Sequence, residues 1–236
     1  MSAGAPSVRP DTPAAIRHVV VLGHPGGESF DHSVVRAYCE TVNDCGQVAV
    51  VRDLYAMHFD PLLRAGERAT RRGFTPAADG AHELELLRDA AVIAFVYPIW
   101  FGLPPAIIKG YVDRVLGAGF VGRDVMLPSQ SMLHGKHMIS FSSSASTRPW
   151  LAEQGQWSAL RQGFDGYLAT IFGLKLDDHV HFDSVVDELK PRFAAEMLET
   201  AREKVRRLCS AVLHERHEAA LHRIRRPAGA TADAQP

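Results

Sequence analysis

Aromatic side chains between Tyr97 and Gly102 are the residues of this chain best suited to hold a planar ligand. They follow a continuous apolar run, Ala90–Val96, and include Trp100 and Phe101. Such a run is typical of a strand buried on both faces of a parallel sheet. Open α/β sheets bind their ligands at the carboxyl ends of their strands. Position alone leaves two interpretations open, a wall for a planar ligand and ordinary packing in the core.

The second candidate is the loop Gly23–Asp31, between an apolar run, Ile16–Leu22, and a stretch with helical spacing. A glycine-containing loop before a helix points backbone N–H groups and the positive end of the helix dipole at one place, which favours an anion. His24 adds a ring donor and Ser29 a hydroxyl. The alternative is a tight turn in which Ser29 or Asp31 caps the helix. The loop matches neither GxGxxG nor the P-loop, so by itself it is a weak phosphate signal.

Hydroxyl side chains form the third candidate, the run Ser142–Thr147, which directly follows the apolar run His137–Phe141. Because the carboxyl ends of parallel strands meet at one edge of a sheet, the three loops should converge there. Together they offer an anion cradle, an aromatic wall and a row of donors. That set suits a planar cofactor that carries phosphate.

These loops must be positioned by an alternation of apolar runs and helical patterns, which predicts an α/β fold with a doubly wound, five-stranded parallel sheet and helices on both faces. The predicted strands are Ile16–Leu22, Gln47–Asp53, Ala90–Val96, His137–Phe141 and Leu174–Phe182. The predicted helices run from the first loop to Gly46, over Leu84–Asp89, from Pro104 to Leu116, from Trp157 to Phe172, and over a long charged stretch, Pro191–Arg226, whose inward residues are Phe193, Met197, Val205, Leu208 and Val212.

We expect a single domain over residues 16–226, with a disordered leader at 1–15 and a disordered tail at 227–236. The leader has no apolar segment of the kind found in signal peptides. Leu62–Gly80 carries charge, glycine and proline but little periodicity, which favours a loop with a short helix.

Composition excludes several classes of function. The chain has 236 residues and a formal net charge of -1, with no basic stripe for nucleic acid and no apolar run long enough for a membrane span. Its three cysteines lack a CxxC pair, which argues against a disulfide framework or zinc site and favours a reducing cytoplasm. Only His179 and His181 form a close histidine pair near other polar groups, and we predict no metal.

Three motifs resemble the flavodoxin-like NAD(P)H:quinone oxidoreductases of the DT-diaphorase type, together with bacterial drug-modulator and potassium-efflux ancillary reductases. They are Leu22–Asp31 (LGHPGGESFD), Asp53–Pro61 (DLYAMHFDP) and Tyr97–Val115 (YPIWFGLPPAIIKGYVDRV). The second and third motifs are long and specific. The similarity runs from about Ile16 to about Val121, and continues more loosely to the last helix.

The resemblance implies a flavin-dependent enzyme that transfers hydride from NADPH or NADH through flavin N5 to a quinone-like or other small electrophilic acceptor, in a ping-pong mechanism. It favours FAD over FMN, because the first loop matches relatives that hold a dinucleotide. It also implies a homodimer in which the partner completes each site. No side chain need be an acid or base, so no catalytic residue is predicted.

The resemblance also assigns binding residues. It implies that the phosphate end of the flavin meets His24, Ser29, Phe30 and Asp31, that the ring lies against Pro98, Ile99, Trp100 and Phe101, and that the pyrimidine side receives donors from Ser142, Ser143, Ser144 and Ala145.

The sequence departs from the family at several of these positions. Asp31 stands where many relatives have Asn, and a carboxylate near phosphate is unfavourable unless it faces away and caps the helix. Ser142–Ala145 replaces a Thr-Thr-Gly-Gly loop and lacks both glycines. The Tyr and His that animal relatives use over the flavin fall near Trp150 and Gln156, which cannot relay a proton. Trp150 and Trp157 could equally form a pocket roof or core.

A second function fits the same motifs, a flavin-binding regulatory or ancillary subunit or redox sensor with little turnover. The basic helix Arg202–Arg226 would then be its docking surface. For Lys109, Asp113 and Arg114, on the polar face of the third helix, solvated or dimer-contact roles are favoured over catalysis.

Overall fold

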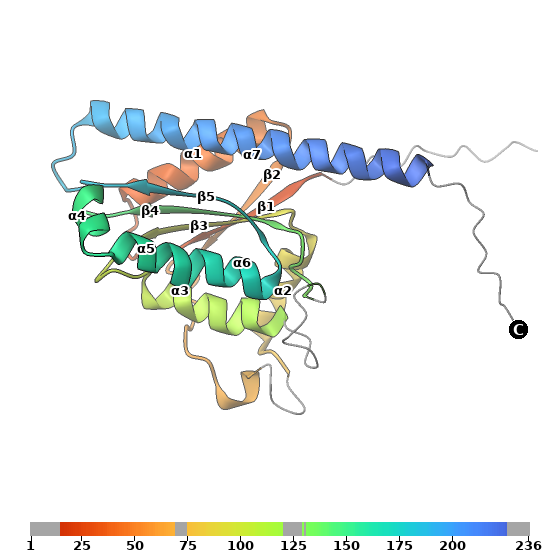
Figure 1. Cartoon of the computed structure of the whole chain (residues 1–236). Helices are drawn as coiled ribbons and strands as arrows, with labels where there is room; N and C mark the ends of the chain where they lie inside the picture. Colours follow the sequence, from red (N-terminus) through yellow and green to blue (C-terminus); the bar gives the residue numbers. More distant parts are fainter. Residues whose placement is uncertain (1–14, 69–74, 120–128, 130, 226–236) are drawn as a thin grey trace, which may run out of the picture.

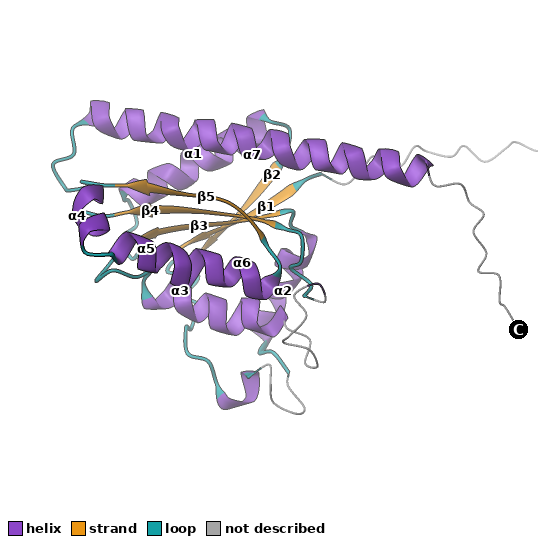
Figure 2. Cartoon of the chain, in the orientation of Figure 1, coloured by secondary structure: helices purple, strands orange, loops and turns teal. Residues whose placement is uncertain are grey.

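The structure, a computed structural model, describes residues 15–68, 75–119, 129 and 131–225. Five parallel strands form one sheet in the order β2-β1-β3-β4-β5. They are β1 (Arg17–Leu22), β2 (Val48–Asp53), β3 (Val92–Pro98), β4 (His137–Ser143) and β5 (Lys175–Phe182) (Figures 1 and 2). The fold class and all five strands predicted from the sequence are confirmed. The predicted tail and, apart from Ala15, the predicted leader lie outside the described residues.

Helices cover both faces of the sheet, as Figure 1 shows. On one face lie α1 (Phe30–Asp44) and α7 (Pro191–Arg225). The other face carries α2 (Ala78–Asp89), α3 (Ala106–Tyr111) with the π-helical η2 (Val112–Leu116), α5 (Gln156–Leu160) with the π-helical η5 (Arg161–Gly166), and α6 (Tyr167–Phe172). Three short elements complete the described part: η1 (Ala65–Glu67), η3 (Gly117–Gly119) and α4 (Arg148–Glu153).

The core is two apolar layers, one on each face of the sheet. All seven residues of β3 and of β4 are buried, as expected for central strands of a parallel sheet. Successive side chains of a strand point to opposite faces. Thus Val19 and Val21 of β1 pack with the α2–α3–α6 layer, whereas Val20 and Leu22 pack with α1 and α7.

Some predicted boundaries move. Strands β3 and β4 each run two residues beyond the predicted ends, because Tyr97 pairs with Ser142 and Pro98 with Ser143. Helix α2 begins at Ala78, six residues before the predicted Leu84. The predicted helix from Trp157 to Phe172 forms, with a π-helical stretch in its middle, and Gly173 ends it at a positive φ of 66°.

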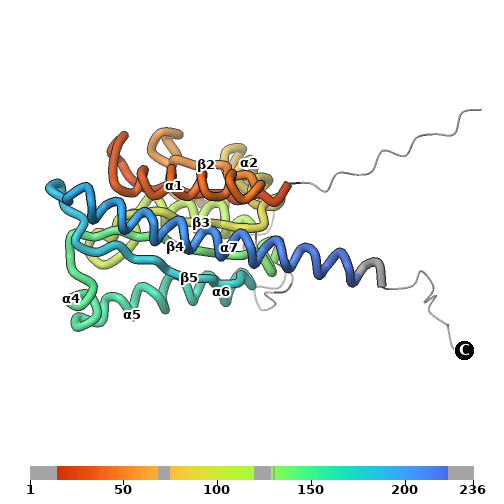
Figure 3. The backbone as a smooth tube through the Cα atoms, turned by 90° about the horizontal axis from the view of Figure 1, so that it is seen from above, coloured from red at the N-terminus to blue at the C-terminus, as the bar shows by residue number. Residues whose placement is uncertain are grey.

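Helix α7 lies along α1 and extends past the sheet at its C-terminal end (Figure 3). Val205, Leu208 and Val212 are buried against the sheet side, as predicted. The prediction for Phe193 is wrong: its side chain is 40% exposed, because it lies in the wall of an open groove along β5. Gln47 fixes the helix from β2's side by donating from Nε2 to the carbonyl of Cys209 at 2.9 Å.

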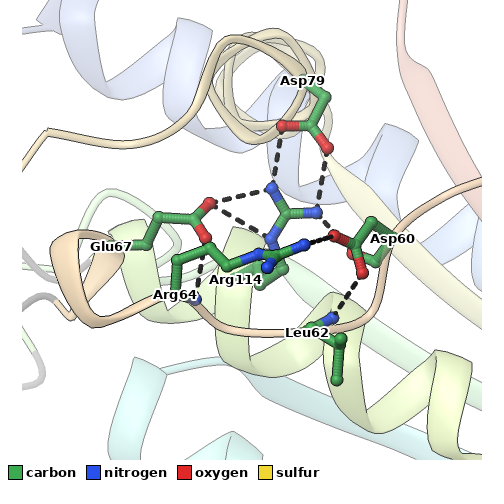
Figure 4. Close-up of polar contacts among 6 residues, drawn as sticks. All are labelled: Asp60, Leu62, Arg64, Glu67, Asp79 and Arg114. Atoms are coloured by element: carbon green, nitrogen blue, oxygen red, sulfur yellow. Dashed lines mark hydrogen bonds and ion pairs between the residues drawn. The ribbon is translucent and has the colours of Figure 1, made fainter.

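Arg114 is buried in an ionic cluster, which contradicts the prediction of a solvated or dimer-contact residue. Its guanidinium pairs with Glu67 and with Asp79, each at 2.8 Å, and donates to the carbonyl of Asp60 (Figure 4). Arg64 contributes a second contact to each end of this loop through Asp60 and Glu67. The cluster therefore ties the segment after β2 and the start of α2 to η2.

The second and third sequence motifs pack against each other at Gly110. A Cβ atom built on Gly110 would lie 2.5 Å from the backbone of Pro61, which is closer than real contacts allow. Glycine at this place in α3 lets the chain after β2 cross directly over the helix. The two motifs thus stabilise one corner of the fold, next to the aromatic loop.

Candidate functional site

A cavity of 560 Å³ opens at the carboxyl edge of the sheet, where the three loops selected from the sequence meet. Its walls come from the loop before α1, the end of β3, the end of β4 and the segment after β5. The lining residues are His24, Glu28, Ser29, Phe30, Asp31, Pro98, Ile99, Trp100, Ser143, Ser144, Ala145, Ser146, Val185, Val186, Asp187 and Leu189.

The first wall is the N-terminus of α1. Ser29 caps this helix, accepting from the backbone N–H of His32 at 3.3 Å, as one of the two sequence interpretations predicts. His24 Nδ1 accepts from the backbone N–H of Gly26 at 3.0 Å, so the neutral ring carries its proton on Nε2. Burial is the main cause that lowers the pKa of His24. The wall therefore combines a helix dipole, free backbone N–H groups and a ring donor, which suits an anion.

Asp31 lies at the same wall and is almost completely buried. Its Oδ2 atom has no hydrogen-bond partner among the residues that the structure describes. Burial raises the pKa of the carboxyl from 3.8 to about 6, and a hydrogen bond with the Ser143 side chain offsets part of that effect. Asp31 does not cap the helix, since Ser29 does. The carboxyl therefore keeps its proton up to about pH 6, well above the usual range of an aspartate, and can be a donor in that form.

The aromatic loop does not pack in the core. Trp100 is 42% exposed and Phe101 is fully exposed, so for these two side chains the core interpretation is wrong. The backbone of Trp100 exchanges both hydrogen bonds with Leu103, at 3.0 and 3.1 Å. Phe101 and Gly102 between them both have positive φ, 51° and 83°, the pattern of a type I′ turn. A tight, strained turn thus holds two aromatic rings out beside the cavity.

The loop after β4 contributes its later residues. Ser143, Ser144 and Ala145 line the cavity, whereas Ser142 does not. The Ser142 side chain is fully buried and its hydroxyl lies between His179 and His181. Its backbone pairs within the sheet. Of the predicted binding residues, only Ser142 lines neither this cavity nor the smaller one beside it that Phe101 lines.

Phe101 lines a second cavity of 300 Å³ beside the first. Ile99, Ser144 and Ser146 line both, so the two cavities adjoin. Trp150 and Gln156 also line the second cavity, so both residues lie beside the aromatic turn and not in the core. Trp157 instead packs on His179 and His181, with ring centroids 4.8 and 5.3 Å apart.

The segment after β5 was not predicted from the sequence to be part of the site. Val185, Val186, Asp187 and Leu189 close the cavity from the side of α7. Val186 and Leu189 also line an open groove of 890 Å³ along β5, so the groove adjoins the cavity. The only sequence signal for this segment was its place at the carboxyl end of the last predicted strand.

A planar ring with a phosphate tail fits this arrangement. The exposed Trp100 and Phe101 offer apolar faces, the helix N-terminus offers donors, and the protonated form of Asp31 would satisfy its orphaned oxygen. Within the described residues no group of His, Cys, Asp and Glu side chains is arranged to hold a metal ion. No helix in that part of the chain is long and apolar enough to cross a membrane.

Comparison with known proteins gives consistent results. A family model described as flavodoxin-like fold matches residues 17–208. An uncharacterized NAD(P)H oxidoreductase of Haemophilus influenzae is 28% identical over 204 residues, covering 85% of this chain and 100% of that protein. NAD(P)H dehydrogenase [quinone] 1 of Rattus norvegicus is 33% identical over 125 residues, which span 45% of each chain. The solved NAD(P)H:quinone oxidoreductase from Methanothermobacter marburgensis superposes with a TM-score of 0.71 at 25% identity, covering 83% of this chain and 96% of that one.

Proposed function

The chain belongs to the flavodoxin-like-fold family, and from that premise we propose that it is a flavin-dependent NAD(P)H oxidoreductase acting on quinone-like acceptors. The observation that carries this proposal is the pair of exposed aromatic rings, Trp100 and Phe101, held beside a cavity with an anion-binding helix N-terminus. When bound there, a flavin supplies the site that takes hydride from a nicotinamide nucleotide and gives it to the acceptor.

The chain's own residues bind and orient the cofactor. We assign the phosphate end to the N-terminus of α1, with His24 and Ser29, and the ring to the turn Pro98–Phe101. Backbone and hydroxyl donors of Ser143–Ala145 lie where negative charge on the pyrimidine side would need them. The smaller cavity, with Trp150 and Gln156 in its wall, is the proposed place for the nicotinamide and then for the acceptor. A single place for both explains a ping-pong order.

FAD is the proposed form of the cofactor. The cavity continues past Val186 and Leu189 into the large groove along β5. That continuation provides room for an adenylate end, which FMN does not have. We further propose a homodimer in the cytoplasm, because the aromatic turn is open on one side and the three cysteines are free thiols.

An anaerobic titration tests the proposal. Purified protein is reconstituted with FAD or FMN and then titrated with NADPH and NADH. We expect tight binding of FAD, bleaching of its visible band by one of the nucleotides, and recovery of the band on addition of a quinone. Bound flavin that neither nucleotide bleaches would indicate the regulatory function instead, and absence of flavin binding would contradict both.

A pair of variants assigns the result to the aromatic turn. Phe101→Ser removes an exposed ring beside the cavity, whereas Tyr167→Ser removes an exposed ring on α6, away from all the cavity-lining residues. We expect only Phe101→Ser to slow bleaching, by about two- to tenfold, since stacking of one aromatic ring contributes about 0.5–1.5 kcal/mol beyond its buried area.

A further inference from the structure

A chain of buried polar side chains connects the interior of the protein with the cofactor cavity. Asp165 Oδ2 accepts from His179 Nδ1 at 2.6 Å, and His179 Nε2 lies 2.7 Å from the hydroxyl of Ser142. That hydroxyl lies 2.9 Å from His181 Nδ1, and His181 Nε2 lies 3.1 Å from the hydroxyl of Ser144. Ser144 lines both the cavity and its smaller neighbour. Four consecutive contacts thus lead from Asp165 to the binding site.

This row of hydrogen-bonded side chains runs between β4 and β5, and helical segments cover it on one side. Asp165, in η5, is fully buried, and so are the side chains of His179 and Ser142. Trp157 of α5 lies across both imidazole rings. The indole shields the chain between its two ends, so that the contacts within it are strengthened by the low local dielectric.

Charged groups approach the histidine pair from each element packed around it. Asp165 faces His179 from η5, and Tyr97 faces it edge-on from β3. Asp183, after β5, and Arg148, in α4, act on His181 with opposite effects on its pKa. Burial is the largest cause, and it lowers the pKa of His181 to about 4. The His181 ring is therefore neutral near pH 7, with one nitrogen that donates and one that accepts.

The protons on these hydrogen-bonded side chains can take two arrangements. With a neutral His179, protonated on Nδ1 toward Asp165, the Ser142 hydroxyl must donate to His179 and accept from His181 Nδ1. With one proton more, His179 Nε2 donates to Ser142, the Ser142 hydroxyl donates to His181 Nδ1, and His181 Nε2 donates to Ser144. The Ser144 hydroxyl then donates to the carbonyl of Ser146 at 2.9 Å, and every group is satisfied.

We propose that the chain Asp165–His179–Ser142–His181–Ser144 is a proton path that delivers one proton to the group reduced in the cavity. The proposal rests on the proposed function, because a quinone-like acceptor that takes a hydride also needs one proton from the protein or from water. The wall residues Trp150 and Gln156 cannot provide it.

The transfer balances bond by bond. The O–H bond of Ser144 breaks as an O–H bond forms on the anionic oxygen of the reduced acceptor, and the proton of His181 Nε2 moves to Ser144. The hydroxyl proton of Ser142 moves to His181 Nδ1, and the proton of His179 Nε2 moves to Ser142. At the end His179 is neutral, and one proton has passed from the hydrogen-bonded side chains to the acceptor. His181, which is only partly buried, also lines the large groove along β5, and water there can return the proton to His179 through His181 and Ser142.

Histidine NMR tests the path without any cofactor. In the full chain labelled with ¹⁵N-histidine, we expect His181 to change from the Nδ1–H to the Nε2–H tautomer when acidification adds one proton to the path. Ser142→Ala should abolish that coupled change, and Ser142→Thr, which keeps the hydroxyl, should restore it. The matched control is Ser140→Ala, because Ser140 also bonds to Asp165, at 2.7 Å, but leads nowhere toward the cavity. A wild-type His181 that keeps one tautomer, or a coupled change that persists in Ser142→Ala, would overturn the proposal.

Kinetics of the FAD-loaded protein provide the second readout. We expect Ser142→Ala to slow reoxidation by 1,4-benzoquinone about a hundredfold, the low end of the usual range for proton transfer by a positioned group, while bleaching by the nicotinamide nucleotide changes less than about twofold. Equal effects on both half-reactions, or the same effect in Ser140→Ala, would assign these serines a structural role and overturn the path. If the wild-type protein shows no bleaching, the proposed function fails and the NMR spectra alone decide the path.

Discussion

The buried carboxyl of Asp31 makes folding depend on pH in a calculable way. Its pKa is about 6 in the folded protein against 3.8 ordinarily, so the folded state holds this proton more tightly than the unfolded state does. At pH values below 3.8 both states are protonated, and the group has no effect on stability. As the pH rises toward 6 the unfolded state ionises first, and stability falls. Above 6 the loss is constant, at about 3 kcal/mol for a pKa difference of about 2 at 1.4 kcal/mol per pKa unit.

Asp31→Asn removes the ionisation but keeps the size of the side chain. We expect the free energy of unfolding of the variant, relative to the parent, to rise by about 2.5 kcal/mol between pH 4 and pH 8, because a small part of the effect already lies below pH 4. The amide NH₂ of the variant would also lack a partner at the position of Oδ2. This can shift the free energy of unfolding by about 1–3 kcal/mol at every pH. The change with pH, and not this constant shift, is the prediction.

Urea unfolding of the flavin-free protein at pH 4, 5, 6, 7 and 8 measures this difference. The control is Asp44→Asn, at the exposed end of the same helix, for which the difference from the parent should stay within about 1 kcal/mol. A difference for Asp31→Asn that does not vary with pH would refute the reasoning, because it would mean that the carboxyl ionises in the folded state as it does in water. Bound FAD should raise the pKa further, since its phosphate is a second negative charge near the carboxyl.

Three further changes test how the site is supported. Arg114→Met should lower the free energy of unfolding by about 3–5 kcal/mol, because it leaves Glu67 buried without its cation, and urea unfolding at pH 7 measures the loss. Gly110→Ala should destabilise by more than about 2 kcal/mol through the clash with the Pro61 backbone, whereas Gly27→Ala, where a Cβ meets nothing within 4 Å, should cost less than about 1 kcal/mol; thermal melts compare the two. Ser29→Ala should cost about 1 kcal/mol of stability through the lost cap and also weaken FAD binding measured by fluorescence quenching, while equal FAD affinity would exclude Ser29 from the phosphate site.

The fold could be predicted from the sequence because the patterns that indicate its strands and helices are local. Apolar runs such as Ala90–Val96 are long enough to identify buried strands, and the alternation of strands and helices determines a doubly wound sheet. The meeting of the three loops at one cavity followed from the parallel direction of the strands. Local patterns do not report what a polar side chain meets across the fold. For that reason Arg114, which reads as a surface residue on a helix, is instead held by Glu67 and Asp79 from distant segments.

The proton path shows the same limit more clearly. Ser140 and Ser142 alternate with core residues of β4, and His179 and His181 alternate with core residues of β5, so each pair has the period of a strand face. That period alone does not bring the pairs together. They become neighbours because the register between the strands shifts near Met138 and Ile139, after which Ser140 pairs with His179 and Ser142 with His181.

A register moved by one residue would turn the histidines out of line with the serines and interrupt every contact in the path. The irregularity near Met138 is therefore as much a part of the proposed chemistry as the side chains themselves. Deleting Asp177, the residue of β5 skipped between the partners of Met138 and Ile139, should give a regular ladder that keeps Ser140 opposite His179 and Ser142 opposite His181, so the coupling of His179 with His181 should persist in the ¹⁵N spectra. Loss of the coupling in this variant would contradict the reasoning, because it would mean that pairing of the serines with the histidines is not enough to form the path.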